Sequence, residues 1–105
     1  MDVFALNYKN SNGLMLKVKM FDKEIDCQLD TGAAISILSE RQWIDLGQPK
    51  LNETDVQPTK FDGTIIKTLG QSYIKFVIDN KESYGTFVVV TSNKSFGLIG
   101  RNIIN

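Results

Sequence analysis

Short runs of alternating hydrophobic and polar residues recur along the chain, while helical periodicity is almost absent. This pattern is typical of strands with one buried face. In the first run every second residue is apolar (Leu14, Leu16, Val18 and Met20). In the second run the apolar face consists of Ile25, Cys27 and Leu29. Asn12-Gly13 predicts a hairpin-type turn before the first strand, and a return at Asp22-Lys23 predicts that the two strands pair.

A short helix is predicted after these strands. Ser39 can cap it, and Gln42 can reach back to the cap as in a capping box. The helix should run to Leu46 and stop at Gly47, a common residue type just past a helix end. Two prolines and scattered polar residues predict a loop over 48–59.

The second half of the chain again predicts strands. Asp62-Gly63 is a strong hairpin signal, and it lies between the short segments 60–61 and 64–66. Further strands are expected at 71–79 and 83–90, joined at Asn80-Lys81, and at 96–99. Residues 101–105 are expected to begin a helix. Because strands predominate, the expected fold is mostly β, with residues 1–105 forming a single domain.

Composition narrows the chemistry. The 105 residues contain 12 basic and 12 acidic side chains, no histidine and one cysteine. Balanced charge without a basic cluster argues against nucleic acid and membrane partners. The absence of histidine excludes catalytic triads and histidine-ligated metals. The lone Cys27 fits a reducing compartment and a core position, and the chain begins without a secretion signal. Carboxylate, lysine or thiol chemistry remains.

The most informative segment is Leu29-Asp30-Thr31-Gly32-Ala33. It places a carboxylate at the end of an apolar strand, followed by a hydroxyl and by a glycine that permits a tight turn. Such a turn can hold a carboxylate in place while its oxygens remain open to a cleft. Asp, Thr and Gly are also common turn residues, so the tripeptide alone is compatible with a surface turn.

A second segment, Phe96-Gly97-Leu98-Ile99-Gly100-Arg101-Asn102, changes this interpretation. The two segments, in this order and with a hairpin between them, resemble the retroviral and retrotransposon aspartic proteases, the retropepsin family. Ala34 directly after Ala33 is more similar to the retrotransposon branch. The resemblance implies a single-lobe closed β-barrel with a flap hairpin and one or two short helices.

The resemblance also implies residue roles. Asp30 would activate water, Thr31 would brace the two catalytic loops across a dimer axis, and Gly32 would let the substrate backbone approach. The side-chain pockets would be lined by Ala33, Ile35, Ile37, Phe96 and Leu98. The flap would cover the substrate with Asp62, Gly63, Thr64 and Ile65. These positions are almost all apolar, which predicts extended peptide or polyprotein substrates with apolar residues beside the cut.

One Asp-Thr-Gly per chain implies a homodimer, because this chemistry needs two carboxyl groups. No metal or organic cofactor is implied, because water is the nucleophile. The resemblance places the enzyme in a polyprotein, in the cytoplasm or in a virus-like particle.

Three features depart from the family pattern. Ala34 replaces a carboxylate that commonly pairs with the arginine matching Arg101, so Asp26, Glu40 or a backbone carbonyl is expected to replace it. Gly63 is the only glycine near the flap tip, and the terminal dimerisation strand is absent from the sequence. Dimerisation would then use residues 3–7 and the loops around Asp30, or further sequence in a parent polyprotein. Two alternatives stay open: a non-catalytic dimerisation or peptide-binding module, and a monomeric fragment inactive until flanking sequence is restored.

Overall fold

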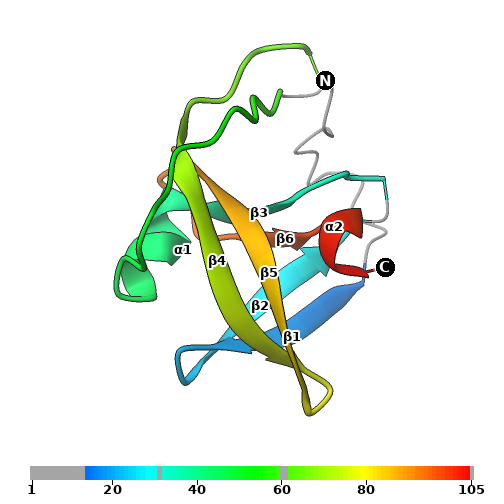
Figure 1. The fold of residues 1–105 in the computed structure, drawn as a ribbon. Coiled ribbons are helices and arrows are strands. Elements are labelled where there is room, and N and C mark those ends of the chain that lie inside the picture. The colour runs from blue at the N-terminus through cyan, green and yellow to red at the C-terminus, as the bar shows by residue number, and fades with distance from the viewer. Residues whose placement is uncertain (1–13, 31, 60–61, 105) are drawn as a thin grey trace.

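The computed structural model describes residues 14–30, 32–59 and 62–104. Six strands and two short helices follow one another in this order: β1 (Met15–Met20), β2 (Lys23–Leu29), β3 (Ser36–Ser39), α1 (Glu40–Asp45), β4 (Thr68–Ile78), β5 (Lys81–Val90), β6 (Gly97–Ile99) and α2 (Arg101–Ile104). The strands form a closed barrel in the order β1-β2-β6-β3-β5-β4 (Figure 1). The predicted mostly β barrel with short helices is therefore confirmed.

The β1–β2 hairpin follows the predicted alternation. Its strands pair antiparallel, and Val18 and Met20 are fully buried. The turn lies at Phe21-Asp22, one residue earlier than predicted, with both residues at positive φ. The prediction that Leu14 is buried is wrong: it precedes the strand and is 67% exposed.

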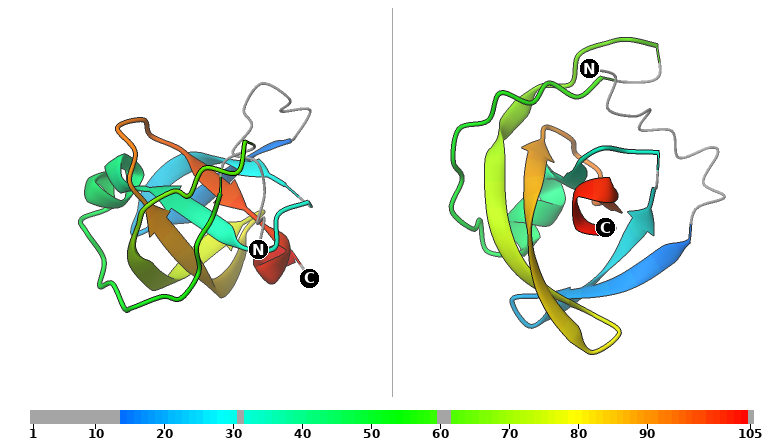
Figure 2. Two further views of the ribbon diagram at one scale, coloured as in Figure 1. Left: turned by 90° about the horizontal axis from the view of Figure 1, so that it is seen from above. Right: turned by 45° about the vertical axis from the view of Figure 1, so that its right-hand side comes forward.

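β4 and β5 form the longest hairpin of the barrel. β4 begins three residues before the predicted start and β5 two residues before. Their turn is at Asp79-Asn80, again at positive φ. The loop between α1 and β4 runs along the outside of β4 (Figure 2), where Asn52 forms an isolated bridge with Gln71. The barrel closes where Lys19 of β1 pairs with Val77 of β4.

Ser39 caps α1 as predicted, because its Oγ accepts a hydrogen bond from the Gln42 N–H at 3.1 Å. The second half of the predicted capping box is wrong. The Ser39 N–H donates instead to the carbonyl of Phe96 at 3.0 Å. β6 lies next to β3 in the barrel, so a tertiary neighbour takes the donor that Gln42 was expected to satisfy.

The hairpin predicted at Asp62-Gly63 forms only in part. The turn is present, with Gly63 at a φ of 88° and the Thr64 N–H donating to Asp62 Oδ1 at 2.9 Å. Among the described residues of this segment, the only pairing is the isolated bridge between Thr59 and Ile65. Lys60 and Phe61 lie outside the described residues, as do Asn12-Gly13 and residues 3–7.

The buried apolar residues form two clusters. The larger fills the barrel and consists of Val18, Met20, Ile25, Cys27, Leu38, Leu46, Ile74, Phe76, Phe87, Val89 and Ile99. The smaller consists of Ala33, Ile37, Ile66, Val88, Val90 and Leu98. Successive residues of β5 thus belong to different clusters, so Val88-Val89-Val90 is buried on both faces.

Candidate active site

Asp30 lies directly after the end of β2. β2 pairs in parallel with β6 up to the register Leu29–Ile99, and the Asp30 N–H then donates to the Ile99 carbonyl at 2.9 Å. The Asp30 carbonyl accepts the Ala33 N–H at 3.1 Å, which closes a tight turn. The carboxylate is therefore fixed to the barrel through its own backbone while the residue remains half-buried.

The carboxylate of Asp30 is also held from within the turn. Its Oδ1 accepts the Gly32 N–H at 2.9 Å. A Cβ on residue 32 would lie only 3.2 Å from the same oxygen, so glycine is the residue that lets the amide approach without crowding. Thr31, the predicted brace between catalytic loops, lies outside the described residues.

The second sequence segment packs against this turn. The Arg101 N–H donates to the Ala33 carbonyl at 2.8 Å. The Gly100 N–H donates to Ser36 Oγ at 2.9 Å, and Ser36 Oγ donates to Asn102 Oδ1 at 2.7 Å. The two segments that carry the family resemblance are therefore in contact.

The prediction that Arg101 is buried and paired with a counter-charge is wrong. The residue is exposed at the start of α2, and within the described chain its side chain forms no ion pair. Asp26, one of the predicted partners, lies 3.4 Å from Lys17 Nζ instead, and Glu40 has no ion pair there either. Since an exposed guanidinium is solvated by water, it needs no counter-charge in the subunit.

The residues predicted to line substrate pockets fall into two groups. Ala33, Ile37 and Leu98 are buried in the smaller apolar cluster, and Ile35 and Phe96 pack against it while partly exposed. The smaller cluster has three further buried members, Ile66 before β4 and Val88 and Val90 of β5. The partly buried Val56 packs against it. The continuous apolar run at the end of β5 indicated that Val88 and Val90 are buried. Nothing in the local sequence pattern distinguished Ile66 and Val56.

The predicted flap residues form a separate exposed turn. Asp62, Gly63, Thr64 and Ile65 are all exposed, and Ile65 is 62% exposed. The segment 62–67 before β4 forms the loop at the top of Figure 1. The base of this loop is fixed, because the Ile66 N–H donates to the Pro58 carbonyl at 2.9 Å. The next residue, Lys67, accepts the Thr91 N–H at 2.9 Å. The exposed turn therefore projects from a base tied to the barrel.

Cys27 and Trp43 belong to the larger cluster or pack against it. Cys27 is fully buried, and burial, assisted by the nearby Asp26 carboxylate, raises the pKa of its thiol to about 12. A thiol with that pKa is a poor nucleophile at neutral pH. Trp43 packs partly buried against the larger cluster, and its Nε1 donates to the Pro49 carbonyl at 2.8 Å. Both residues therefore serve packing.

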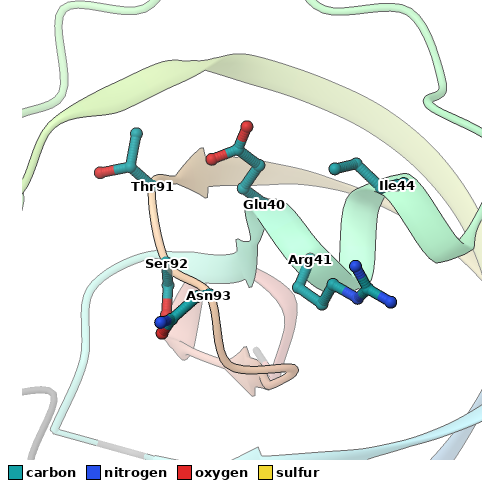
Figure 3. Close-up of a pocket in the computed structure, with 6 residues that line it drawn as sticks. All are labelled: Glu40, Arg41, Ile44, Thr91, Ser92 and Asn93. Carbon is teal, nitrogen blue, oxygen red and sulfur yellow. The ribbon is translucent and has the colours of Figure 1, made fainter.

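An open pocket of about 450 Å³ lies away from these residues. It is formed by α1 and the loop after β5 (Figure 3), and its lining is mostly polar: Glu40, Arg41, Ile44, Thr91, Ser92 and Asn93. It includes none of the predicted site residues. In the described part of the chain, three or more Cys, Asp or Glu side chains do not gather as metal ligands would, and no helix there has the length and apolarity to span a membrane.

Comparison with known proteins agrees with this geometry. The sequence model of the family described as retroviral aspartyl protease matches residues 10–105. The chain belongs to this family. The matched residues include the barrel, the Asp30 turn and the segment that packs behind this turn.

Individual relatives extend the comparison. K02A2.6 of Caenorhabditis elegans, an uncharacterized protein, is 29% identical over 90 residues, which cover 86% of this chain and 7% of that protein. The chain thus spans a small part of that relative's length. Among solved structures, EIAV protease complexed with the inhibitor HBY-793 has a TM-score of 0.74 at 17% identity, covering 94% of this chain and 91% of that one.

A second solved structure is the retroviral protease-like domain of Ddi1 from Leishmania major. Its TM-score is 0.69 at 15% identity, covering 86% of this chain and 73% of the other. At these identities the two structures support the fold. The barrel of this retroviral aspartyl protease domain is therefore shared with proteins that differ from it at most positions.

Proposed function

We propose that this domain is an aspartic endopeptidase that is active as a homodimer, with one Asp30 from each subunit. The observation that carries the proposal is the Asp30 turn, in which a half-buried carboxylate is tied to β6 through its backbone and accepts the Gly32 N–H at 2.9 Å. A carboxylate fixed in this way is suited to general acid–base work.

One carboxylate cannot supply both the acid and the base. Two carboxyl groups about 3 Å apart cannot both ionise, so they share one proton. The ionised one takes a proton from water, whose oxygen forms a bond to the scissile carbonyl carbon, while the protonated one gives its proton to the carbonyl oxygen. When the C–N bond breaks, the leaving amine takes a proton from one carboxyl group, and a hydroxyl of the tetrahedral intermediate gives its proton to the other carboxylate as the carbonyl re-forms, so the pair again shares one proton. A two-fold axis beside Asp30 would supply the second carboxyl.

The apolar surroundings favour extended peptides with apolar residues beside the cut. The proposed pocket residues Ala33, Ile37 and Leu98 lie in the smaller cluster, and the flap turn projects from a tied base. Substrate would add to the site as a strand, its backbone held by hydrogen bonds and its side chains in apolar pockets. In this proposal Thr31 braces the two loops and residues Asp62–Ile65 cover the substrate.

The natural context proposed for the domain is a polyprotein. Its C. elegans relative is far longer than this chain, which covers 7% of it. We take residues 1–105 as a single protease domain that processes such a polyprotein, in the cytoplasm or in a virus-like particle. The peptide bonds next to the domain are then its nearest substrates.

The test compares two aspartates. Asp30→Asn should lower kcat/KM for peptides with apolar junctions by about 10³-fold or more, while sedimentation still shows dimers. Asp22→Asn is the matched control, since Asp22 is exposed in a turn at a φ of 65°, a conformation that Asn also tolerates. Full cleavage by Asp30→Asn would remove Asp30 as the catalyst.

The same experiment separates the alternatives. A wild-type dimer without turnover between mildly acidic and neutral pH would favour a non-catalytic dimerisation or peptide-binding module. A monomer at all concentrations, with cleavage recovered in a longer chain, would favour an incomplete fragment.

A further inference from the structure

The buried hydroxyl of Ser36 connects three elements of the barrel. Ser36 is fully buried at the start of β3. Its Oγ accepts the Gly100 N–H at 2.9 Å and donates to Asn102 Oδ1 at 2.7 Å. Asn102 Nδ2 in turn donates to the Thr86 carbonyl of β5 at 2.9 Å. The hydroxyl therefore ties β3 to α2, and α2 is tied to β5.

Gly100 lies between two contacts with the proposed catalytic turn. The residue before it, Ile99, accepts the Asp30 N–H at 2.9 Å, and the residue after it, Arg101, donates its N–H to the Ala33 carbonyl at 2.8 Å. Both ends of the turn therefore depend on the segment 99–101. The hydrogen bond from Gly100 to Ser36 fixes the middle of that segment.

We propose that Ser36 and Asn102 are positioning residues, which set the place of the Asp30 carboxylate against its counterpart in the second subunit. This inference rests on the proposed function. The hydrogen bonds that connect Ser36, Gly100 and Asn102 are made by hydroxyl, amide and backbone groups without formal charge. Within the described residues, the Arg101 guanidinium forms no ion pair. Short hydrogen bonds fix geometry, and a shift of about 1 Å in a reacting group costs about 100-fold in rate.

Removing the hydroxyl should therefore act on kcat. Ser36→Ala leaves the buried Gly100 N–H without its acceptor, so the segment 99–101 and the Asp30 turn lose their common support. We expect kcat per dimer to fall about 10-fold to 100-fold. KM should stay within about 3-fold, because the proposed pocket residues remain in place. Ser36→Thr keeps the hydroxyl and should retain most of the wild-type kcat.

Asn102→Ala provides a second variant in case Ser36→Ala does not fold. Asn102 is exposed, and its loss leaves the Ser36 hydroxyl able to accept the Gly100 N–H. We expect kcat to fall by about 5-fold to 20-fold with KM little changed. Ile74→Val is the control for stability alone, because Ile74 is fully buried in β4 and the change costs about 1 kcal/mol.

The measurement is steady-state kinetics on the chain of residues 1–105, normalised to the concentration of folded dimer from sedimentation. The inference is supported if every one of the variants Ser36→Ala and Asn102→Ala that folds has a lower kcat per dimer, while Ile74→Val does not. Unchanged kcat per dimer in either folded variant, or an equal loss in Ile74→Val, would overturn it. An inactive wild-type dimer would instead overturn the proposed function, and the inference with it.

Discussion

Gly100 lies against the backbone of Ile35. A Cβ at position 100 would collide with the Ile35 carbonyl oxygen and would lie 2.9 Å from the carbonyl oxygen of Ala33. These contacts are between backbone segments, which cannot move aside as a flexible side chain can. The segment that ends β6 can therefore pack behind the Asp30 turn only with glycine at position 100.

Gly100→Ala should therefore destabilise the domain strongly. The added methyl group must separate two backbone segments that also exchange the Arg101–Ala33 hydrogen bond at 2.8 Å. We expect the free energy of unfolding to fall by about 3 kcal/mol, at the upper end for overpacking. Urea unfolding followed by circular dichroism measures the loss.

Ser95→Ala is the control for Gly100→Ala, because Ser95 is exposed and its replacement should change stability by less than about 0.5 kcal/mol. If Gly100→Ala unfolds at the same urea concentration as this control, the two backbone segments are not in contact.

Ser39→Ala should lower stability at a different place. Ser39 is fully buried, and its Oγ accepts N–H donors from two elements, Gln42 of α1 at 3.1 Å and Phe96 before β6 at 3.0 Å. Alanine removes the helix cap and leaves a buried donor without a partner. Together these should cost about 2 kcal/mol, measured by urea unfolding. Ser83→Ala, an exposed serine of β5, should cost much less; equal losses would show that the cap contributes nothing.

Cys27 predicts how stability changes at high pH. In the unfolded chain the thiol titrates near its ordinary pKa of 9.0, whereas in the folded domain burial raises the pKa to about 12. Above pH 9 the unfolded state therefore loses a proton that the folded state keeps. Stability from this group is complete below pH 9 and is lost as pH rises toward 12, by about 1.4 kcal/mol per pH unit once the unfolded thiol is ionised.

The measurement compares wild type with Cys27→Ala by urea unfolding at pH 8 and pH 10. Other groups that titrate in this range affect both proteins, so the difference isolates the thiol. Wild type should lose about 1.4 kcal/mol more than Cys27→Ala between the two pH values. Parallel losses in both proteins would mean that the thiol is not protected from ionisation in the folded state.

The local pattern of the sequence was sufficient for most strands and for the helix cap. Alternation identified β1, β2 and β4, because each has one face in the core, whereas the end of β5 is a continuous apolar run that is buried on both faces. Ser39 was recognised because a cap depends on neighbours within three residues. Strand ends were less accurate: β4 extends to Thr68 across a register shift between Thr68 and Gly70, and the extra residue there, Leu69, interrupts the alternation.

Features that depend on tertiary neighbours could not be predicted from the local sequence pattern. The exposure of Arg101 and the use of the Ser39 N–H by Phe96 follow from where β6 and α2 lie in the barrel. The same holds for Ser36, whose buried hydroxyl bonds to residues 64 and 66 positions later. A serine in an apolar strand gives no local sign of such partners, so the sequence identified the proposed catalytic carboxylate but not the residues that hold its turn.

Mixing two forms of the chain tests whether the site needs both subunits. When wild type and Asp30→Asn are combined in equal amounts and their dimers exchange freely, about a quarter of the dimers are wild type on both sides. Because the total protein is doubled, activity should fall to about half that of wild type alone, since mixed dimers have only one of the two carboxyl groups. The measurement is cleavage of an apolar-junction peptide at protein concentrations where sedimentation shows dimers. Activity that stays at the wild-type level would mean that each chain has a complete site of its own, and the shared pair of Asp30 residues would have to be abandoned.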